Sequence, residues 1–215
     1  MKYKLIIFDL DGTLLNTIGD LTDSVNYAMR FLQFPEHTEE EVLTFVGNGN
    51  RVLMERCLPA GTAADTIDLA LKKFHEYYSR HYADKTHPYE KIPELLAGLK
   101  ASGYLLAVVS NKADYAVQDI CKTYFDGIFD FVLGDREGIR RKPASDPVDR
   151  AVQVLGVTPT QSIYIGDSEV DIETASNAGI PCISVDWGFR PHDDLVAAGA
   201  WIIVSSPDDI YSCLS

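Results

Sequence analysis

Two aspartates stand two residues apart in the segment Asp9-Leu10-Asp11-Gly12-Thr13. A carboxylate can accept a phosphoryl group as an acyl phosphate, which divides one difficult hydrolysis into two steps. We therefore interpret Asp9 as a nucleophile and Asp11 as the acid and base that protonates the leaving group and later activates water. That role predicts a pKa of Asp11 raised by neighbouring carboxylates. Taken alone, the segment is also compatible with an ordinary turn.

A metal ion is the second requirement of this chemistry, because a phosphate dianion beside several aspartates needs a countercharge. Hard oxygen ligands favour Mg²⁺, which accepts one or two carboxylates together with water and phosphate oxygen. We predict Asp167 as the second metal carboxylate beside Asp9. Asp171 lies one helical turn later, so it faces the same site or holds coordinated water. The alternative for Asp167 and Asp171 is a favourable interaction with the dipole of the following helix.

Donors for the phosphate oxygens form a third group of candidates. The Gly12 amide can reach an equatorial oxygen because glycine lets the backbone approach closely. Ser110 and Asn111 offer a hydroxyl and an amide, and Lys142 offers a point charge. Thr13 is included with them as a phosphate-binding residue. The structural alternatives are a helix cap for Ser110 and a solvated surface position for Lys142.

The elements that must position these residues are read from the hydrophobic pattern. Residues 4–10 are nearly all apolar, as in a strand buried on both faces of a parallel sheet. Residues 16–87 carry apolar residues at helical spacing without a convincing strand. After Pro88 the pattern alternates. It predicts helices at 92–101, 115–124, 147–155 and 170–178 and strands at 105–109, 129–133, 162–165, 181–185 and 201–204.

Strands that alternate with helices of this length predict an α/β fold, a doubly wound parallel sheet with right-handed crossovers. We assign residues 1–15 and 87–215 to this catalytic core and residues 16–86 to an inserted all-helical cap domain. Ligands of such sheets bind outside the carboxyl ends of the strands. That rule brings Asp9, Ser110 and Asp167 to one edge, with Lys142 in a nearby loop.

These residues resemble the motifs of the haloacid dehalogenase superfamily of phosphohydrolases, a Rossmann-like fold. The matching segments occur in the expected order over the whole chain: Phe8-Asp9-Leu10-Asp11-Gly12-Thr13-Leu14, Val108-Val109-Ser110-Asn111-Lys112, Lys142-Pro143 and Ile165-Gly166-Asp167-Ser168-Glu169-Val170-Asp171. The resemblance implies that the Asp9 side chain, the Asp11 carbonyl and Asp167 hold Mg²⁺. It also implies that Ser110 and Lys142 bind phosphate and that the helical insert opens and closes over the cleft.

Within that superfamily, residues 46–56 resemble the cap segment of phosphoglycolate phosphatases. Arg51 is suited to a two-pronged contact with a substrate carboxylate, and Asn48 is the other candidate for substrate contact. A glycine-rich turn before a helix is also a common structural helix start, so both readings stay open. The expected substrate is 2-phosphoglycolate or a similar small phosphorylated metabolite.

Composition limits the range of partners. The 215 residues are 46% hydrophobic, enough for one substantial core, and the formal net charge is −13. That charge opposes nucleic-acid binding, which depends on lysine and arginine. No apolar run reaches the roughly 20 residues of a membrane helix, and the apolar N-terminal stretch is too short for a signal peptide. We expect a cytoplasmic protein, either a monomer or a homodimer, without a membrane or nucleic-acid partner.

Several alternatives share parts of this pattern. A sugar-phosphate mutase would use the same Asp9 and Asp11 but return the phosphate to the sugar, and pyrophosphatases and nucleotidases carry related caps. A phospho-acceptor signalling module also places an aspartate, a lysine and Mg²⁺ on a doubly wound sheet. Such a module needs a lasting phosphoaspartate and no cap. Here Asp11 would speed hydrolysis, and about 70 inserted residues exceed ordinary connections in α/β units.

Overall fold

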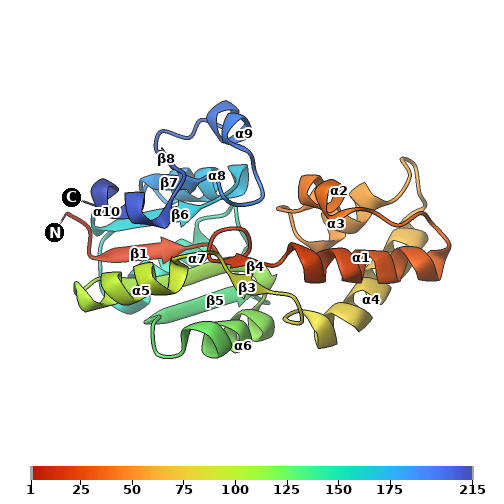
Figure 1. Cartoon of the computed structure of the whole chain (residues 1–215), viewed down its shortest axis with the longest axis horizontal. Helices are drawn as coiled ribbons and strands as arrows, with labels where there is room; N and C mark the ends of the chain where they lie inside the picture. The colour runs from red at the N-terminus through yellow and green to blue at the C-terminus, as the bar shows by residue number, and fades with distance from the viewer. Residues whose placement is uncertain (1, 215) are drawn as a thin grey trace. The chain divides into compact units, whose positions relative to one another are not determined.

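The computed structural model describes residues 2–214, which divide into two compact units at Leu15 and Pro88 (Figure 1). Of the described residues, the first unit contains 2–15 and 88–214, and the second contains 16–87. A two-residue strand lies at each chain crossing between the units, β2 (Leu15–Asn16) and β3 (His87–Pro88), and the two strands pair with each other. The hydrophobic pattern predicted neither strand, because two residues are too few to show a period.

A six-stranded parallel sheet forms the centre of the first unit, in the order β5-β4-β1-β6-β7-β8. Its strands are β1 (Leu5–Phe8), β4 (Leu105–Ala113), β5 (Phe131–Asp135), β6 (Ser162–Gly166), β7 (Cys182–Val185) and β8 (Ile203–Val204). Every residue of β1 is buried, as a strand at the centre of a covered sheet requires. The predicted doubly wound parallel sheet is therefore confirmed.

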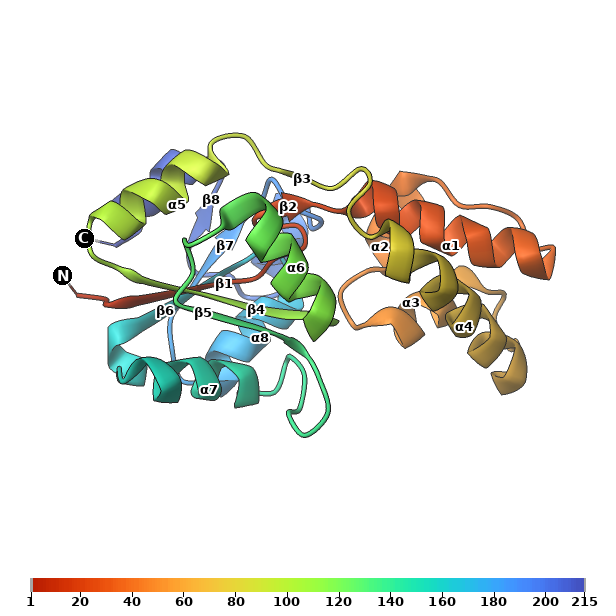
Figure 2. The same ribbon diagram turned by 90° about the horizontal axis from the view of Figure 1, so that it is seen from below.

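Helices cover both faces of this sheet. Figure 2 shows α5 (Ile92–Ala101) and α6 (Asp114–Phe125) on one side and α7 (Asp146–Leu155) and α8 (Glu169–Asn177) on the other. This follows from right-handed crossovers, because the chain steps outward from β1 to β5 and then returns past β1 to β6 and β7. The order in which strands are added to the sheet thus reverses beside β1. Ligands of such sheets bind at this point, outside the carboxyl ends of the strands.

Some helices and strands of the first unit begin or end at other residues than the hydrophobic pattern predicted. Strand β4 continues to Ala113, four residues past the predicted end, with an irregular register against β5 between Val109 and Ala113. Such irregularities re-aim side chains and are common beside functional sites. The short helices α9 (His192–Ala197) and α10 (Ile210–Cys213) were not predicted, and neither were the 3₁₀ turns at Pro159–Gln161 and Pro207–Asp209.

The second unit consists of four helices, α1 (Ile18–Leu32), α2 (Glu39–Phe45), α3 (Asn50–Cys57) and α4 (Ala64–His81). Val25 and Met29 of α1 and Phe74 of α4 are fully buried in it. The buried carboxylate of Asp20 accepts hydrogen bonds from the amides of Lys85 and Thr86 and from the Thr86 hydroxyl, at 2.8–3.1 Å. Asp20 therefore ties the start of α1 to the end of the unit. Across residues 2–214, no helix is both long and apolar enough to cross a membrane.

Candidate active site

The predicted site residues of the first unit gather at the carboxyl ends of β1, β4 and β6. Asp9 follows β1 directly, Ser110 and Asn111 lie in β4 within its irregular stretch between Val109 and Ala113, and Asp167 follows β6. Each follows a run of buried apolar residues that fixes the strand in the core. The carboxyl ends of neighbouring parallel strands lie at the same edge of the sheet. Residues that follow these strands are therefore neighbours in space although they are far apart in sequence.

Asp9 is 8% exposed and is held through one of its two carboxylate oxygens. Its Oδ1 accepts a hydrogen bond of 2.7 Å from the Leu10 amide and forms an ion pair of 2.8 Å with Nζ of Lys142. Its Oδ2 has no hydrogen-bond partner among the described residues. This arrangement fixes the carboxylate while one oxygen remains free for chemistry.

Asp167 is held from two directions. The Thr13 hydroxyl donates to its Oδ1 at 3.0 Å, and the Phe189 amide donates to its Oδ2 at 2.8 Å. A carboxylate oxygen has two lone-pair sites, so each oxygen retains one for a metal ion. Asp9, Asp167 and Asp171 each offer an oxygen atom within 4.8 Å of the others, which makes them a group that can hold a metal.

The electrostatics of this group favour a cation. Burial raises the pKa of Asp167 to about 7, and the negative charge of Asp171 adds to the effect. Burial also raises the pKa of Asp9 well above its usual range, with further contributions from Asp171 and Asp167, although the charge of Lys142 opposes it. Two buried carboxylates whose charged forms are disfavoured in this way gain from a divalent ion between them.

Asp171 differs from the other two carboxylates because its oxygens are already saturated. Its Oδ1 accepts from Nζ of Lys142 at 2.8 Å and from the Tyr164 hydroxyl at 3.2 Å. Its Oδ2 accepts from the amide and hydroxyl of Ser168 at 3.1 and 2.6 Å, which forms the capping box of α8. Asp171 therefore anchors Lys142 and the start of α8, whereas Asp9 and Asp167 keep oxygen lone pairs for an ion.

Lys142 carries three N–H donors, and the structure gives each one an acceptor: Asp9, Asp171 and the Tyr164 hydroxyl at 3.1 Å. Burial opposes the charged form of Lys142, but the two carboxylates outweigh it and raise its pKa well above the usual range. Lys142 is thus a permanent cation. Its direct contact with a phosphate oxygen, predicted from the sequence, requires one of these three acceptors to be replaced.

In the Asp9–Thr13 loop, both predicted phosphate donors already have protein acceptors. The Gly12 amide donates to the Leu15 carbonyl at 2.9 Å, and the Thr13 hydroxyl donates to Asp167, so neither donor is free. Gly12 is required here for another reason. Its φ is +84°, and a Cβ atom at this position would lie 2.2 Å from Oδ2 of Asp167. Gly12 and Thr13 therefore shape the surroundings of Asp167 and orient its carboxylate.

Ser110 and Asn111 keep polar atoms for a ligand. The Ser110 Oγ accepts from the Lys112 amide at 3.2 Å, which leaves its own hydrogen available to a phosphate oxygen. The Asn111 amide group donates to the Lys142 carbonyl at 3.1 Å, and this fixes the loop that carries the lysine. The Asn111 Oδ1 is buried without a hydrogen-bond partner.

Asp11 has a cationic partner that the sequence analysis did not assign. Nζ of the buried Lys112 lies 2.8 Å from Oδ1 of Asp11. The structure thus places a lysine beside Asp11, where neighbouring carboxylates were expected. The signal was present, because Lys112 directly follows Ser110 and Asn111 and lies on the strand beside β1.

A second missed group is the loop after β7, Asp186-Trp187-Gly188-Phe189-Arg190. The Trp187 indole donates to the Thr13 carbonyl at 3.1 Å, and a Cβ atom on Gly188 would lie 2.3 Å from the Gly12 carbonyl oxygen. Arg190 forms a two-pronged ion pair with Glu169 at the start of α8. The rule of strand ends points to this loop when it is applied to the predicted strand at 181–185.

The two candidate substrate residues of the helical unit are engaged in ion pairs and hydrogen bonds within that unit. Arg51 pairs with Asp68 at 2.6 Å and with Glu55 at 3.2 Å. The Asn48 Oδ1 accepts from Nη2 of Arg56 at 2.8 Å. Only Nε and Nη1 of Arg51 are engaged among residues 2–214, so the guanidinium keeps donors for a further anion.

Comparison with known proteins identifies the family. The family model of haloacid dehalogenase-like hydrolases matches residues 6–185. The chain is 35% identical to a phosphoglycolate phosphatase of Mannheimia succiniciproducens over 197 residues, 88% of each chain. It is 31% identical to a phosphoglycolate phosphatase of Aquifex aeolicus over 86% of each chain.

Solved structures agree with this result. A candidate phosphoglycolate phosphatase from Lactobacillus delbrueckii subsp. bulgaricus superposes with a TM-score of 0.96 at 38% identity, covering 100% of this chain and 99% of the other. These matches confirm the resemblance and the predicted enzyme class. The chain belongs to the family of haloacid dehalogenase-like hydrolases and is a phosphatase of that family.

Proposed function

We propose that the protein is a Mg²⁺-dependent phosphatase that hydrolyses a small phosphomonoester through an aspartyl phosphate on Asp9, with 2-phosphoglycolate as the first candidate substrate. The observation that carries the proposal is the state of Asp9. One oxygen is fixed by the Leu10 amide and Lys142, and the other has no hydrogen-bond partner among residues 2–214. A nucleophile needs this combination of a fixed direction and a free attacking atom.

The donors fit Mg²⁺. Asp9 and Asp167 supply hard carboxylate oxygens, and their pKa values are raised because burial and mutual repulsion are not relieved by protein cations alone. We propose that these two side chains and the Asp11 carbonyl hold the ion. When bound, it would neutralise the carboxylates and withdraw charge from the phosphoryl oxygens.

The residues of this chain carry the remaining steps. The free Asp9 oxygen attacks phosphorus, and the bond to the leaving oxygen breaks as Asp11 donates its proton there. Asp11 then takes a proton from water, which attacks phosphorus and frees Asp9 and inorganic phosphate. We propose that the Ser110 hydroxyl, whose own hydrogen is not engaged, donates to a phosphoryl oxygen and that Lys142 holds Asp9 in position throughout.

The choice of substrate rests on the relatives and on the helical unit, residues 16–87. Curated relatives at 31–35% identity are phosphoglycolate phosphatases. Phosphoglycolate carries a carboxylate besides its phosphate, and Arg51 has donors left for such a group. We propose that this unit caps the core, that Arg51 and Asn48 select the substrate, and that the enzyme works in the cytoplasm with small metabolites as its partners.

The test is a screen of phosphate release with Mg²⁺ present, across phosphoglycolate, sugar phosphates, nucleotides and pyrophosphate. We expect the highest kcat/KM for phosphoglycolate and no release by Asp9→Asn protein. A flat profile would remove the substrate assignment and leave the reaction class intact. Interconversion of sugar phosphates without phosphate release would identify a mutase, and a phosphoaspartate that persists for hours would identify a phospho-acceptor module.

A further inference from the structure

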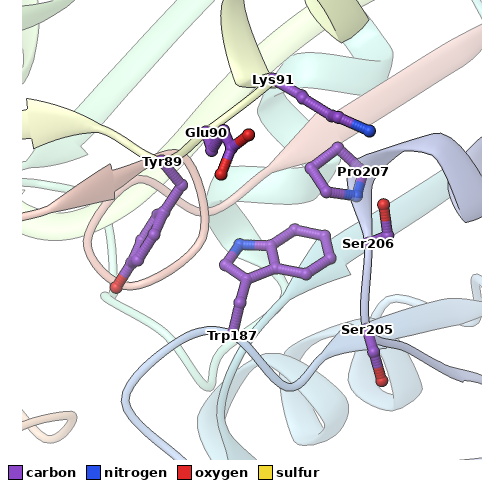
Figure 3. Close-up of a pocket in the computed structure, with 7 residues that line it drawn as sticks. All are labelled: Tyr89, Glu90, Lys91, Trp187, Ser205, Ser206 and Pro207. Carbon is purple, nitrogen blue, oxygen red and sulfur yellow. The ribbon is translucent and has the colours of Figure 1, made fainter.

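A cavity of about 340 Å³ lies in the first unit. It is lined by Tyr89, Glu90, Lys91, Trp187 and residues 205–207 (Figure 3). A volume of this size is at the lower end of sites for small molecules, roughly 300–1,000 Å³. None of the four sequence motifs contributes to it.

The polar groups around the cavity are nearly all engaged with protein partners. Lys91 forms an ion pair with Asp208, and the Ser205 hydroxyl donates to Asp186 at 2.8 Å. The Ser206 hydroxyl accepts from the Asp208 amide at 3.3 Å. Glu90 has no hydrogen bond or ion pair within residues 2–214; its carboxylate is exposed and interacts electrostatically with the neighbouring Lys91.

Two aromatic side chains, Tyr89 and Trp187, line the cavity together with this carboxylate. In Figure 3 the Glu90 carboxylate lies above the indole of Trp187, with the phenol ring of Tyr89 to one side, while the Lys91 ammonium points away from it. Trp187 cannot turn freely because its indole N–H is bound to the Thr13 carbonyl. A carboxylate beside aromatic faces is the environment that attracts an organic ammonium ion.

We propose that this cavity binds a small organic cation, an amine or a quaternary ammonium compound, which contacts the Trp187 and Tyr89 rings and pairs with Glu90. The protein's net charge of −13 raises the local concentration of such cations.

The walls of the cavity are also supports of the candidate active site. Trp187 donates to the Thr13 carbonyl, and two residues later the Phe189 amide donates to Asp167. The Tyr89 amide donates to the Leu14 carbonyl at 3.1 Å. A ligand that packs against Trp187 therefore contacts the loop whose Phe189 amide holds Asp167, and we infer that it changes the affinity for Mg²⁺. This second step rests on the proposed function, whereas binding of the cation does not.

Binding is tested by tryptophan fluorescence. The chain has two tryptophans, and Trp201 is 97% exposed, so Trp201→Phe leaves Trp187 as the single reporter at little structural cost. Choline chloride is titrated into this protein, with sodium chloride at equal ionic strength as the reference. We expect a saturable change with choline only. Glu90→Gln in the same background should weaken binding at least tenfold.

Glu94→Gln is the matched control, because it removes the same charge from an exposed residue of α5 that does not line the cavity. Its choline affinity should stay within twofold of the parent. Equal affinity in the Glu90→Gln and Glu94→Gln proteins, or no saturable change, would overturn the site. A saturating signal without any change in the Mg²⁺ concentration for half-maximal phosphate release would overturn the coupling alone.

Discussion

The Thr13 hydroxyl donates a hydrogen bond of 3.0 Å to Oδ1 of Asp167, a residue 154 positions later in the chain. Both residues are buried, at 1% exposure each. The bond joins the loop after β1 to the end of β6 and fixes the orientation of a proposed metal carboxylate. Residues behind metal ligands typically change metal affinity 10–100-fold when they are replaced.

Thr13→Val keeps the shape of the side chain and removes this hydrogen bond. We expect the Mg²⁺ concentration for half-maximal phosphate release to rise about tenfold or more, because Asp167 loses its orienting donor. Thr13→Ser retains the hydroxyl and should stay within about threefold of the parent. Equal Mg²⁺ requirements in the valine and serine proteins would show that the hydroxyl has no part in metal binding.

Asp9→Asn removes the nucleophile with almost no change in volume. We expect kcat to fall by about 10⁴ or more, a size typical of losing a nucleophile. The fold should persist because Lys142 keeps Asp171 and Tyr164 as partners. Phosphate release gives the rate, and circular dichroism with a thermal melt checks the fold. Unchanged hydrolysis in a folded Asp9→Asn protein would rule out the covalent mechanism.

The dependence of Mg²⁺ affinity on pH follows from Asp167, whose pKa is raised to about 7 by burial and by Asp171. Below this pH the carboxyl group is protonated, so the ion must displace a proton to bind. The apparent Mg²⁺ affinity should fall about tenfold per pH unit below 7 and level off above it. Calorimetric titrations at pH 6, 7 and 8 measure this slope, and a constant affinity across them would contradict the assignment of Asp167.

Tyr164→Phe tests the buried network around Lys142. The Tyr164 hydroxyl is fully buried and lies 3.1 Å from Nζ of Lys142 and 3.2 Å from the Val109 carbonyl. Its loss leaves a buried donor unsatisfied, so we expect the free energy of unfolding to drop by about 1–3 kcal/mol. Urea denaturation measures it. Tyr104→Phe alters a half-buried tyrosine elsewhere and should change the stability by less than about 0.5 kcal/mol.

Arg51→Ala tests whether the helical unit binds the carboxylate of the substrate. We expect KM for phosphoglycolate to rise about tenfold or more, the effect of losing a charge-assisted contact. KM for a phosphomonoester without a carboxylate, such as ethyl phosphate, should stay nearly constant. Arg80→Ala removes an exposed arginine of α4 and serves as the control. A parallel rise of KM for both substrates would show that Arg51 acts only through the structure of its helix.

The sequence by itself determined the parallel sheet, its order of alternating elements and the edge at which Asp9, Ser110 and Asp167 meet. This was possible because buried strands leave a strong apolar pattern and because their carboxyl ends must lie together. It did not determine which polar groups are free. The Gly12 amide and the Thr13 hydroxyl looked like phosphate donors, yet both are engaged by protein acceptors.

Only the tertiary structure decided these partners, because a hydrogen bond depends on where two distant segments place their atoms to within a few tenths of an ångström. Lys112 reaches Asp11 from the neighbouring strand, and the loop after β7 places Trp187 and Phe189 against Thr13 and Asp167. Strand periodicity fixes which face a side chain occupies, but it carries no information about such directions. The residue types therefore determine which reaction the site can carry out, whereas the packing of the loops determines which of its polar atoms remain free to contact a substrate or a metal ion.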